Sequence, residues 1–452
     1  MSNFRLIDRE TGFLMPASVD EWLPARHLAR FVVEVIGTLD LRSMTGHYRG
    51  SGEASYHPQL LLGIIVYGYA TGVFSSRKLE RASYDSVAMR FVAANEHPDH
   101  DTIAAFRRRF LPQIEALFVQ VLRLAREMGV LKLGTVALDG TKIHANASRH
   151  SALSYQHASQ IEAQLQAEVA DLMARAEAAD QADVPDGMQI PAELARRETR
   201  LAAIAAAKAK IEARAKARYV DAKAEYDAKL ARQEAKKAAG KKSGGKPLVV
   251  PVEAPLPTDQ VNLTDEDSRI MPVAGGGFEQ CYNAQALVAA DSLLVLATDV
   301  VQAPNDKQQL VPMLGKIAAL PDELGKVGAL LADNGYLSED NVNACAAAGI
   351  DPVIAMRREA HHLGLDERFA DAPPPPEDPT PLAAMAHRLQ TPEGKKLYAL
   401  RKQIPEPVFG IIKSVLGFRQ FLLRGLDRVR GEWSLVTMAW NIKRMFVLAG
   451  AN

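Results

Sequence analysis

The first 130 or so residues carry apolar side chains at steps of three and four positions, the spacing of helices with one buried face. Residues 60–74 are almost wholly apolar and predict a buried core helix. A longer helix is expected after Asp101 and Thr102, which can cap its start. Basic residues fall outside the apolar stripes, so we expect a cationic surface. Its members are Arg77, Lys78, Arg81, Arg107, Arg108 and Arg109.

Short apolar runs replace this helical spacing beyond residue 132. Residues 133–138 and 327–332 each form a run that stops at a polar turn, as buried strands do. Residues 278–290 and 293–301 predict a hairpin of two strands, and residues 352–355 a further strand. With the helices expected between them, the order is β-β-β-α-β-α-β-α. This is the order of the ribonuclease H fold, an α/β fold.

Residues 155–245 interrupt that order after its first strand and return to helical spacing. They are rich in alanine and contain a Pro-Gly break at 184–187. We therefore expect a hairpin of two long antiparallel helices. The Lys- and Gly-rich residues 241–247 and the Pro-rich residues 251–257 have the composition of a flexible return segment.

The 452-residue length predicts two or three domains. The two cysteines, Cys281 and Cys345, lie far apart and outside any Cys-x-x-Cys pattern, which disfavours a disulfide framework or zinc site and fits the cytoplasm. The N-terminal residues show no signal-peptide pattern. The apolar stretch 60–74 is shorter than the roughly 20 residues of a membrane span. No membrane partner is expected.

The net charge is zero, but the charges are segregated along the chain. Residues 395–430 hold nine Lys and Arg against two acidic residues, and residues 208–246 hold thirteen against five. Such basic stretches are compatible with a surface that follows phosphate groups.

Three carboxylates stand in unusual settings. Asp139 and Asp333 each follow a predicted buried strand, and in open α/β sheets the chemistry gathers at the carboxyl ends of strands. Glu406 lies between two prolines, and we expect it to cap or begin a helix with Pro407 at the first helical position. Each acid also has an ordinary alternative: Asp139 and Asp333 as turn residues, Glu406 as a helix cap. Folded together, the three could bind divalent metal ions.

The neighbourhood of Glu406 carries a family resemblance. Tyr398, Arg401, Glu406 and Lys413 occur in that order and resemble the Tyr-Arg-Glu-Lys signature of bacterial insertion-sequence transposases of the Asp-Asp-Glu type. The segments 139–148, 281–285, 304–306 and 441–444 look like the same family. Many members place three residues between the Arg and the Glu, whereas this chain places four.

The resemblance implies a catalytic and metal-binding trio of Asp139, Asp333 and Glu406 that holds two ions of Mg²⁺ or Mn²⁺. It also implies DNA contacts from Tyr398, which would stack on or position a displaced base, and from Arg401 and Lys413, which would hold backbone phosphates. The partners would be the terminal inverted repeats of a transposon, target DNA and a second copy of the chain in a homodimer.

The expected organisation follows from both lines of reasoning. Residues 1–130 would form a helical DNA-binding domain, and residues 131–452 a ribonuclease H-like catalytic domain interrupted by the helical hairpin insert. The expected activity is metal-dependent cleavage at transposon ends followed by strand transfer. Two alternatives stay open at this point: a metal-dependent nuclease without joining activity, and a catalytically inactive DNA-binding regulator.

Overall fold

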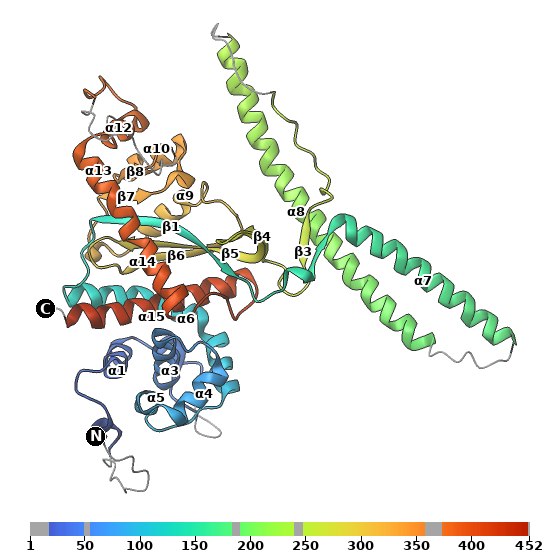
Figure 1. Ribbon diagram of the computed structural model, residues 1–452, viewed down its shortest axis with the longest axis horizontal. Coiled ribbons are helices and arrows are strands. Elements are labelled where there is room, and N and C mark those ends of the chain that lie inside the picture. The colour runs from blue at the N-terminus through green and yellow to red at the C-terminus, as the bar shows by residue number, and fades with distance from the viewer. Residues whose placement is uncertain (1–17, 49–54, 183–189, 239–246, 358–372, 451–452) are drawn as a thin grey trace, which may run out of the picture. The chain divides into compact units, whose positions relative to one another are not determined.

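The computed structural model describes residues 18–48, 55–182, 190–238, 247–357 and 373–450 (Figure 1). These residues divide into two compact units. The first lies within Met1–Asn146, Met271–Gly276 and Cys281–Asn452, and the second within Ala147–Ile270 and Gly277–Gln280. The expected three-part division at residues 130, 155 and 245 stays a prediction.

The first unit begins with helices, as the apolar spacing predicted. They are η1 (Val19–Trp22), α1 (Leu28–Thr38), α2 (Arg42–Thr45), α3 (Pro58–Thr71), α4 (Ser76–Asp85), α5 (Val87–Val92) and α6 (His100–Glu127). The residues of α3 from Leu61 to Ala70 are all buried, which confirms the predicted core helix. Asp99, rather than Asp101 or Thr102, caps α6 by accepting a hydrogen bond from the Thr102 amide at 2.7 Å.

The sheet of this unit is mixed. Its strands are β1 (Thr135–His144), β4 (Arg269–Pro272), β5 (Phe278–Ala289), β6 (Val295–Val301), β7 (Ala329–Ala332) and β8 (Asp351–Ile354). The order is β4-β5-β1-β7-β8, and β6 also pairs with β5 as an additional strand outside this order. β1 is antiparallel to β5 and parallel to β7, and β7 is parallel to β8. The strands β1, β5, β6, β7 and β8 follow one another along the chain as predicted, whereas β4 was not predicted.

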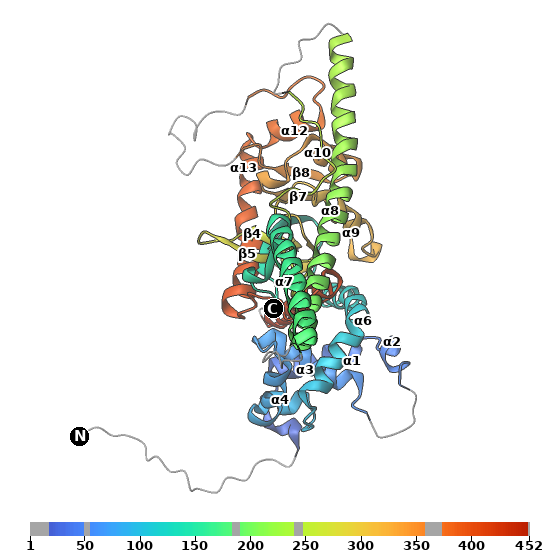
Figure 2. The ribbon, with the colours of Figure 1, turned by 90° about the vertical axis from the view of Figure 1, so that its right-hand side faces the viewer.

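The helices of this unit that come after β6 in the chain pack against strands of the sheet or against one another. They are α9 (Leu310–Ala318), η3 (Asp322–Leu324), η4 (Asn334–Tyr336), α10 (Glu339–Ala347), α12 (Pro381–Arg388), α13 (Pro392–Ala399), η5 (Leu400–Gln403), α14 (Pro405–Gly410), the π-helix η6 (Ile411–Val415) and α15 (Leu426–Ala449). α10 and α12 lie beside β8 (Figure 2). α15 packs on β6, and also on α3 and α6 (Figure 1). This one helix thus belongs to the core of the sheet and to that of the N-terminal helices.

The second unit contains the helices expected for the insert. Its elements are η2 (Arg149–Ser151), β2 (Ala152–Ser154), α7 (Tyr155–Ala182), α8 (Ile190–Ala238) and β3 (Gln260–Asn262), and β2 pairs with β3. Ion pairs join Glu168 to Arg197 and Glu162 to Lys208, so α7 and α8 run antiparallel, as predicted. The expected break at 184–187 lies within the residues outside the description. One cluster of buried apolar residues in this unit consists of Leu153, Ala158, Leu165, Ile204, Ala207, Ile211 and Val261. Leu172 and Ala215 are buried as well.

Within the described ranges, no single helix is both long enough and apolar enough to cross a membrane. The pair α3 and α4, bent by 95°, meets the criteria of length and composition when taken together.

Candidate active site

The two aspartates come together through the parallel pairing of β1 and β7. Val136 lies opposite Leu330 and Ala137 opposite Leu331. Asp139 lies two positions after Ala137, and Asp333 lies two positions after Leu331. This register therefore places the two acids at neighbouring positions. Besides burial, the negative charge of Asp333 accordingly raises the pKa of Asp139.

The expectation that Asp139 ends a strand is wrong, whereas the same expectation for Asp333 is confirmed. β1 continues to His144 because Asp139 and the five residues after it pair with β5. β7 stops at Ala332, and Asp333 then caps the turn η4 by accepting a hydrogen bond from the Gly335 amide at 2.8 Å. Asp139 thus lies where β1 loses its parallel neighbour.

Asp139 sits in a setting that disfavours its charge. Burial raises its pKa to about 7, and the nearby carboxylates of Asp333 and Asp306 act in the same direction. The Gly140 amide, which donates a hydrogen bond to Asp139 Oδ1 at 2.8 Å, and the Arg401 guanidinium oppose this rise. A positive ion beside this carboxyl would stabilise its ionised form.

Glu406 reaches the same place from a helix. α14 begins at Pro405, so Glu406 is its second residue and the prediction of Pro407 at the first helical position is wrong by two residues. Pro405 takes that position, where a missing N–H costs nothing. Arg401 approaches Glu406 Oε1 at 3.3 Å and Asp139 Oδ2 at 3.9 Å. One guanidinium therefore lies within reach of both acids.

The segment between Arg401 and Glu406 includes part of a 3-10 turn. η5 covers Leu400–Gln403, between α13 and α14. The Arg401 side chain is only 12% exposed, and its Nε atom has no hydrogen-bond partner within the described part of the chain. A buried cation with an unsatisfied donor is costly, so the two carboxylates account for its position.

Lys413 lies on the π-helix η6 and contacts the strand of Asp139. Its Nζ donates to Thr141 Oγ1 at 3.0 Å and to the Lys142 carbonyl at 3.4 Å. Burial lowers the pKa of Lys413. π-Helical turns are rare and are frequently found at functional sites. Tyr398 is half-buried on α13.

The donor atoms fit a hard divalent cation in kind, since all three side chains offer carboxylate oxygens. Among the residues described, no group of three or more His, Cys, Asp or Glu side chains is already gathered closely enough to hold a metal ion. The Arg401 guanidinium stands between Asp139 and Glu406 instead. It supplies part of the positive charge that this group of acids requires.

The basic residues of the N-terminal helices do not share one environment. Arg77, Lys78, Arg81, Arg108 and Arg109 are exposed, as expected. Arg107 is buried, so its expected place on the cationic surface is wrong. Its Nη1 donates to the Tyr69 hydroxyl at 2.7 Å and to the Phe74 carbonyl at 3.2 Å, and Glu432 lies near. The spacing carried the signal: position 107 lies four residues after Ile103 and three before Phe110, within the apolar stripe.

Four polar residues beside the aspartates received no role from the sequence: Asn283, Gln285, Asp306 and Tyr336. Asp306 Oδ1 accepts from Asn283 Nδ2 at 2.6 Å and from Gln285 Nε2 at 2.7 Å, and the Tyr336 hydroxyl donates to Gln285 Oε1. We call them the Asp306 network. The signal was a pair of polar residues within the buried strand β5.

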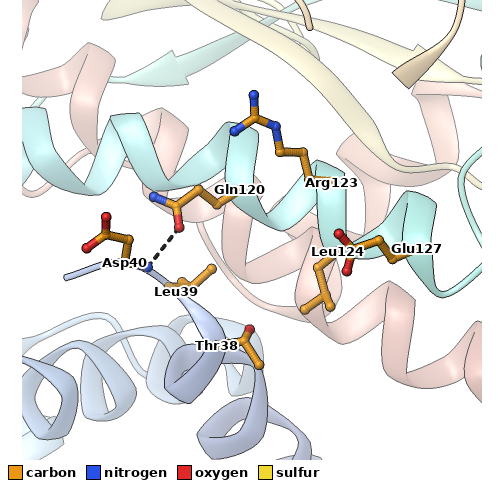
Figure 3. Close-up of a pocket in the computed structure, with 7 residues that line it drawn as sticks. All are labelled: Thr38, Leu39, Asp40, Gln120, Arg123, Leu124 and Glu127. Carbon is orange, nitrogen blue, oxygen red and sulfur yellow. Dashed lines mark hydrogen bonds between the residues drawn. The ribbon is translucent and has the colours of Figure 1, made fainter. Parts of the chain in front are cut away.

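One pocket of about 400 Å³ lies elsewhere in this unit, between the end of α1 and α6 (Figure 3). Gln120 Oε1 there accepts a hydrogen bond from the Asp40 amide at 2.8 Å. None of the three carboxylates lines this pocket.

Comparison with known proteins identifies two regions. Residues 17–109 match the family model described as a transposase domain (DUF772), and residues 259–442 match the model described as a transposase DDE domain. The second match contains Asp333 and Glu406, and together the matches span more than half of the chain. No curated protein and no solved structure matches it. A DDE transposase domain implies a ribonuclease H-like core, with which the mixed sheet is consistent. The chain therefore belongs to the DDE transposases of insertion sequences.

Proposed function

We propose that Asp139, Asp333 and Glu406 are the catalytic carboxylates and bind two divalent ions, Mg²⁺ or Mn²⁺. The protein would cleave DNA at the transposon ends and then join the freed 3′ ends to target DNA. The observation that carries this proposal is the position of Arg401, whose guanidinium reaches both Asp139 and Glu406. Enzymes of this family generally use divalent metal ions and act on DNA.

The roles of the side chains follow from their settings. When bound, the metal would supply Lewis-acid activation of the attacking oxygen and stabilise the leaving oxygen. Asp139 and Asp333 provide ligands from neighbouring positions of the sheet, which fixes their spacing. Glu406, exposed on the first turn of α14, completes the set from the other direction. Its side chain is 53% exposed and is therefore free to adjust.

The cations around the trio suit the phosphate backbone. Lys413 touches β1 two residues beyond Asp139, and Arg401 lies beside that acid. We propose that Arg401 and Lys413 contact the DNA backbone near the cleaved bond and that Tyr398 positions a displaced base. Exposed cations of the N-terminal helices would bind the transposon ends: Arg77, Lys78, Arg81, Arg108 and Arg109. Because two transposon ends must be brought together, we propose that the protein acts as a homodimer.

The test is to replace each acid by its amide: Asp139→Asn, Asp333→Asn and Glu406→Gln. Each change removes one metal ligand while keeping the side-chain shape. Cleavage and strand transfer, measured with labelled end DNA, should fall on the order of a thousandfold, which corresponds to about 4 kcal/mol of transition-state stabilisation. DNA binding without metal should persist, because affinity comes largely from basic side chains.

Asp291→Asn is the matched control, since Asp291 is an exposed aspartate of the same unit. It should leave both reactions intact. Strand transfer with pre-cut ends separates a transposase from a nuclease that cannot join. Full activity of Asp139→Asn or Glu406→Gln would refute the assignment of these acids.

A further inference from the structure

The Asp306 network occupies the interior beside the two aspartates. Asn283, Gln285 and Tyr336 are fully buried. Burial raises the pKa of the Tyr336 hydroxyl well above its ordinary value, so this group remains a donor. It donates to Gln285, whose amide in turn donates to Asp306. The hydrogen bonds thus run in one direction, from the turn η4 through β5 to the segment before α9.

The network is in close contact with the backbone beside Asp139. A methyl group at Gly140 would lie 2.3 Å from Gln285 Nε2, 2.6 Å from Asp306 Oδ1 and 2.8 Å from Asn283 Oδ1. Such distances are too short for carbon, so glycine is required at this position. Successive residues of a strand point to opposite faces, and the network therefore supports β1 from the face opposite the Asp139 side chain.

The network also fixes the turn that carries Asp333. Tyr336 is the last residue of η4, three positions after Asp333. Asn341 Nδ2 donates to the Tyr336 carbonyl and to the Lys307 carbonyl, both at 2.7 Å. The turn after Asp333 and the segment after Asp306 are consequently held by one side chain of α10. These bonds add to the four-residue strand β7 and to the hydrogen bond from the Asn334 side chain to the Ala355 carbonyl at 3.2 Å, which also hold this turn.

We propose that Asp306 and Tyr336 are positioning residues that set the spacing of the Asp139 and Asp333 carboxylates for a divalent metal. This rests on the proposed function. Neither residue is itself a metal ligand in this proposal. They act through Gln285 and Gly140, as hydrogen bonds behind metal ligands commonly orient them.

A purely structural role is the competing explanation, because buried polar groups must be paired in any fold. The two explanations differ in what they predict for the folded protein. A structural role lowers the melting temperature and leaves the metal affinity of the folded molecules unchanged. A positioning role weakens metal binding even where folding is complete.

Tyr336→Phe is the sharpest variant, because it removes only the hydroxyl that donates to Gln285. Binding of Mn²⁺ alone, followed by electron paramagnetic resonance well below the melting temperature, should weaken about 10- to 100-fold. The kcat of strand transfer should fall while the KM for end DNA stays the same. Asp306→Asn, which removes the charge and adds a donor, should show the same pattern and provides a second measurement.

Tyr69→Phe is the matched control. Tyr69 is also fully buried, and its hydroxyl accepts from Arg107 at 2.7 Å, so its loss should destabilise the fold comparably. It should leave Mn²⁺ affinity at the unmodified value. Equal Mn²⁺ affinity of the unmodified protein, Tyr336→Phe and Asp306→Asn would overturn the positioning role and leave the carboxylate site standing. Absence of Mn²⁺ binding to the unmodified protein would overturn the proposed metal site itself.

Discussion

Burial gives Asp139 an acid–base behaviour unlike that of a surface aspartate. Its pKa is raised from 3.8 to about 7 in the folded protein. Between about pH 4 and pH 7, the Asp139 carboxyl of the metal-free folded protein therefore keeps a proton that the unfolded chain has already released. Divalent metal must displace this proton, so metal affinity is expected to rise with pH up to about 7.

The same shift predicts a pH-dependent stability. Above about pH 4 the folded state binds more protons than the unfolded state, so the free energy of unfolding falls as pH rises towards 7. The loss should be on the order of a few kcal/mol. Asp139→Asn removes this group. In urea unfolding with chelator, the variant should therefore become more stable relative to the unmodified protein as pH rises from about 5 to 8. Parallel pH profiles of the two proteins would contradict the raised pKa.

Alanine substitution of Arg107 and of its neighbour Arg108 should affect different properties: the first the stability of the fold, the second the binding of DNA. Arg107→Ala leaves Glu432 fully buried without its cation, which should cost about 3–5 kcal/mol in the free energy of unfolding. Arg108 is exposed, so Arg108→Ala should leave stability almost unchanged. If Arg108 contacts phosphate, its loss lowers the salt-dependence slope of end binding by about 0.9. Chemical unfolding and binding titrations at several salt concentrations measure both. A stable Arg107→Ala protein would contradict this electrostatic role of Arg107 beside Glu432.

At the level of elements, the sequence predicted the strands and their order because apolar runs and turns are local signals. It could not predict how far β1 extends, since that depends on pairing with β5, more than a hundred residues later. Arg107 differs, because its place in the apolar stripe indicated burial. The sequence could not predict its electrostatic partner Glu432, which lies more than three hundred residues later. The three proposed carboxylates could be selected from the motifs around them, and their role stays a prediction. The Asp306 network required the three-dimensional packing of β5, η4 and the segment before α9.

The helices α7 and α8 give a prediction at this scale. Their buried core ends at Ala215, and no later residue of α8 with a described burial is buried. We expect this outer part to be marginally stable alone and to gain order from a partner. Replacing residues 155–245 by a short Gly/Ser linker should preserve the metal site but weaken dimerisation or end pairing. Native gels with paired ends, together with Mn²⁺ binding, would measure this.

One outcome would remove the assembly role. If the shortened protein joined paired ends at full rate as a dimer, the two helices would be dispensable for the reaction. Loss of Mn²⁺ binding in the shortened protein would instead show that the insert supports the catalytic fold.

Across the first unit, the N-terminal helices and the catalytic sheet share one interior. The Tyr69 hydroxyl, Arg107 and Glu432 meet there, and Glu432 Oε2 also accepts from the Leu422 and Leu423 amides at 3.0 Å. The Trp433 indole donates to the Gln285 carbonyl at 2.9 Å. The N-terminal helices therefore form one compact unit with the sheet and are not a domain on a free linker.

The place of α15 in the chain has a consequence for the protein as it is being synthesised. This helix fills the interior of both regions, yet it follows every strand of the sheet. A ribosome releases the N-terminal helices and the strands long before the segment that closes them emerges. The growing chain therefore carries an uncovered apolar surface until α15 has been synthesised, and only then can the two regions close over a common interior.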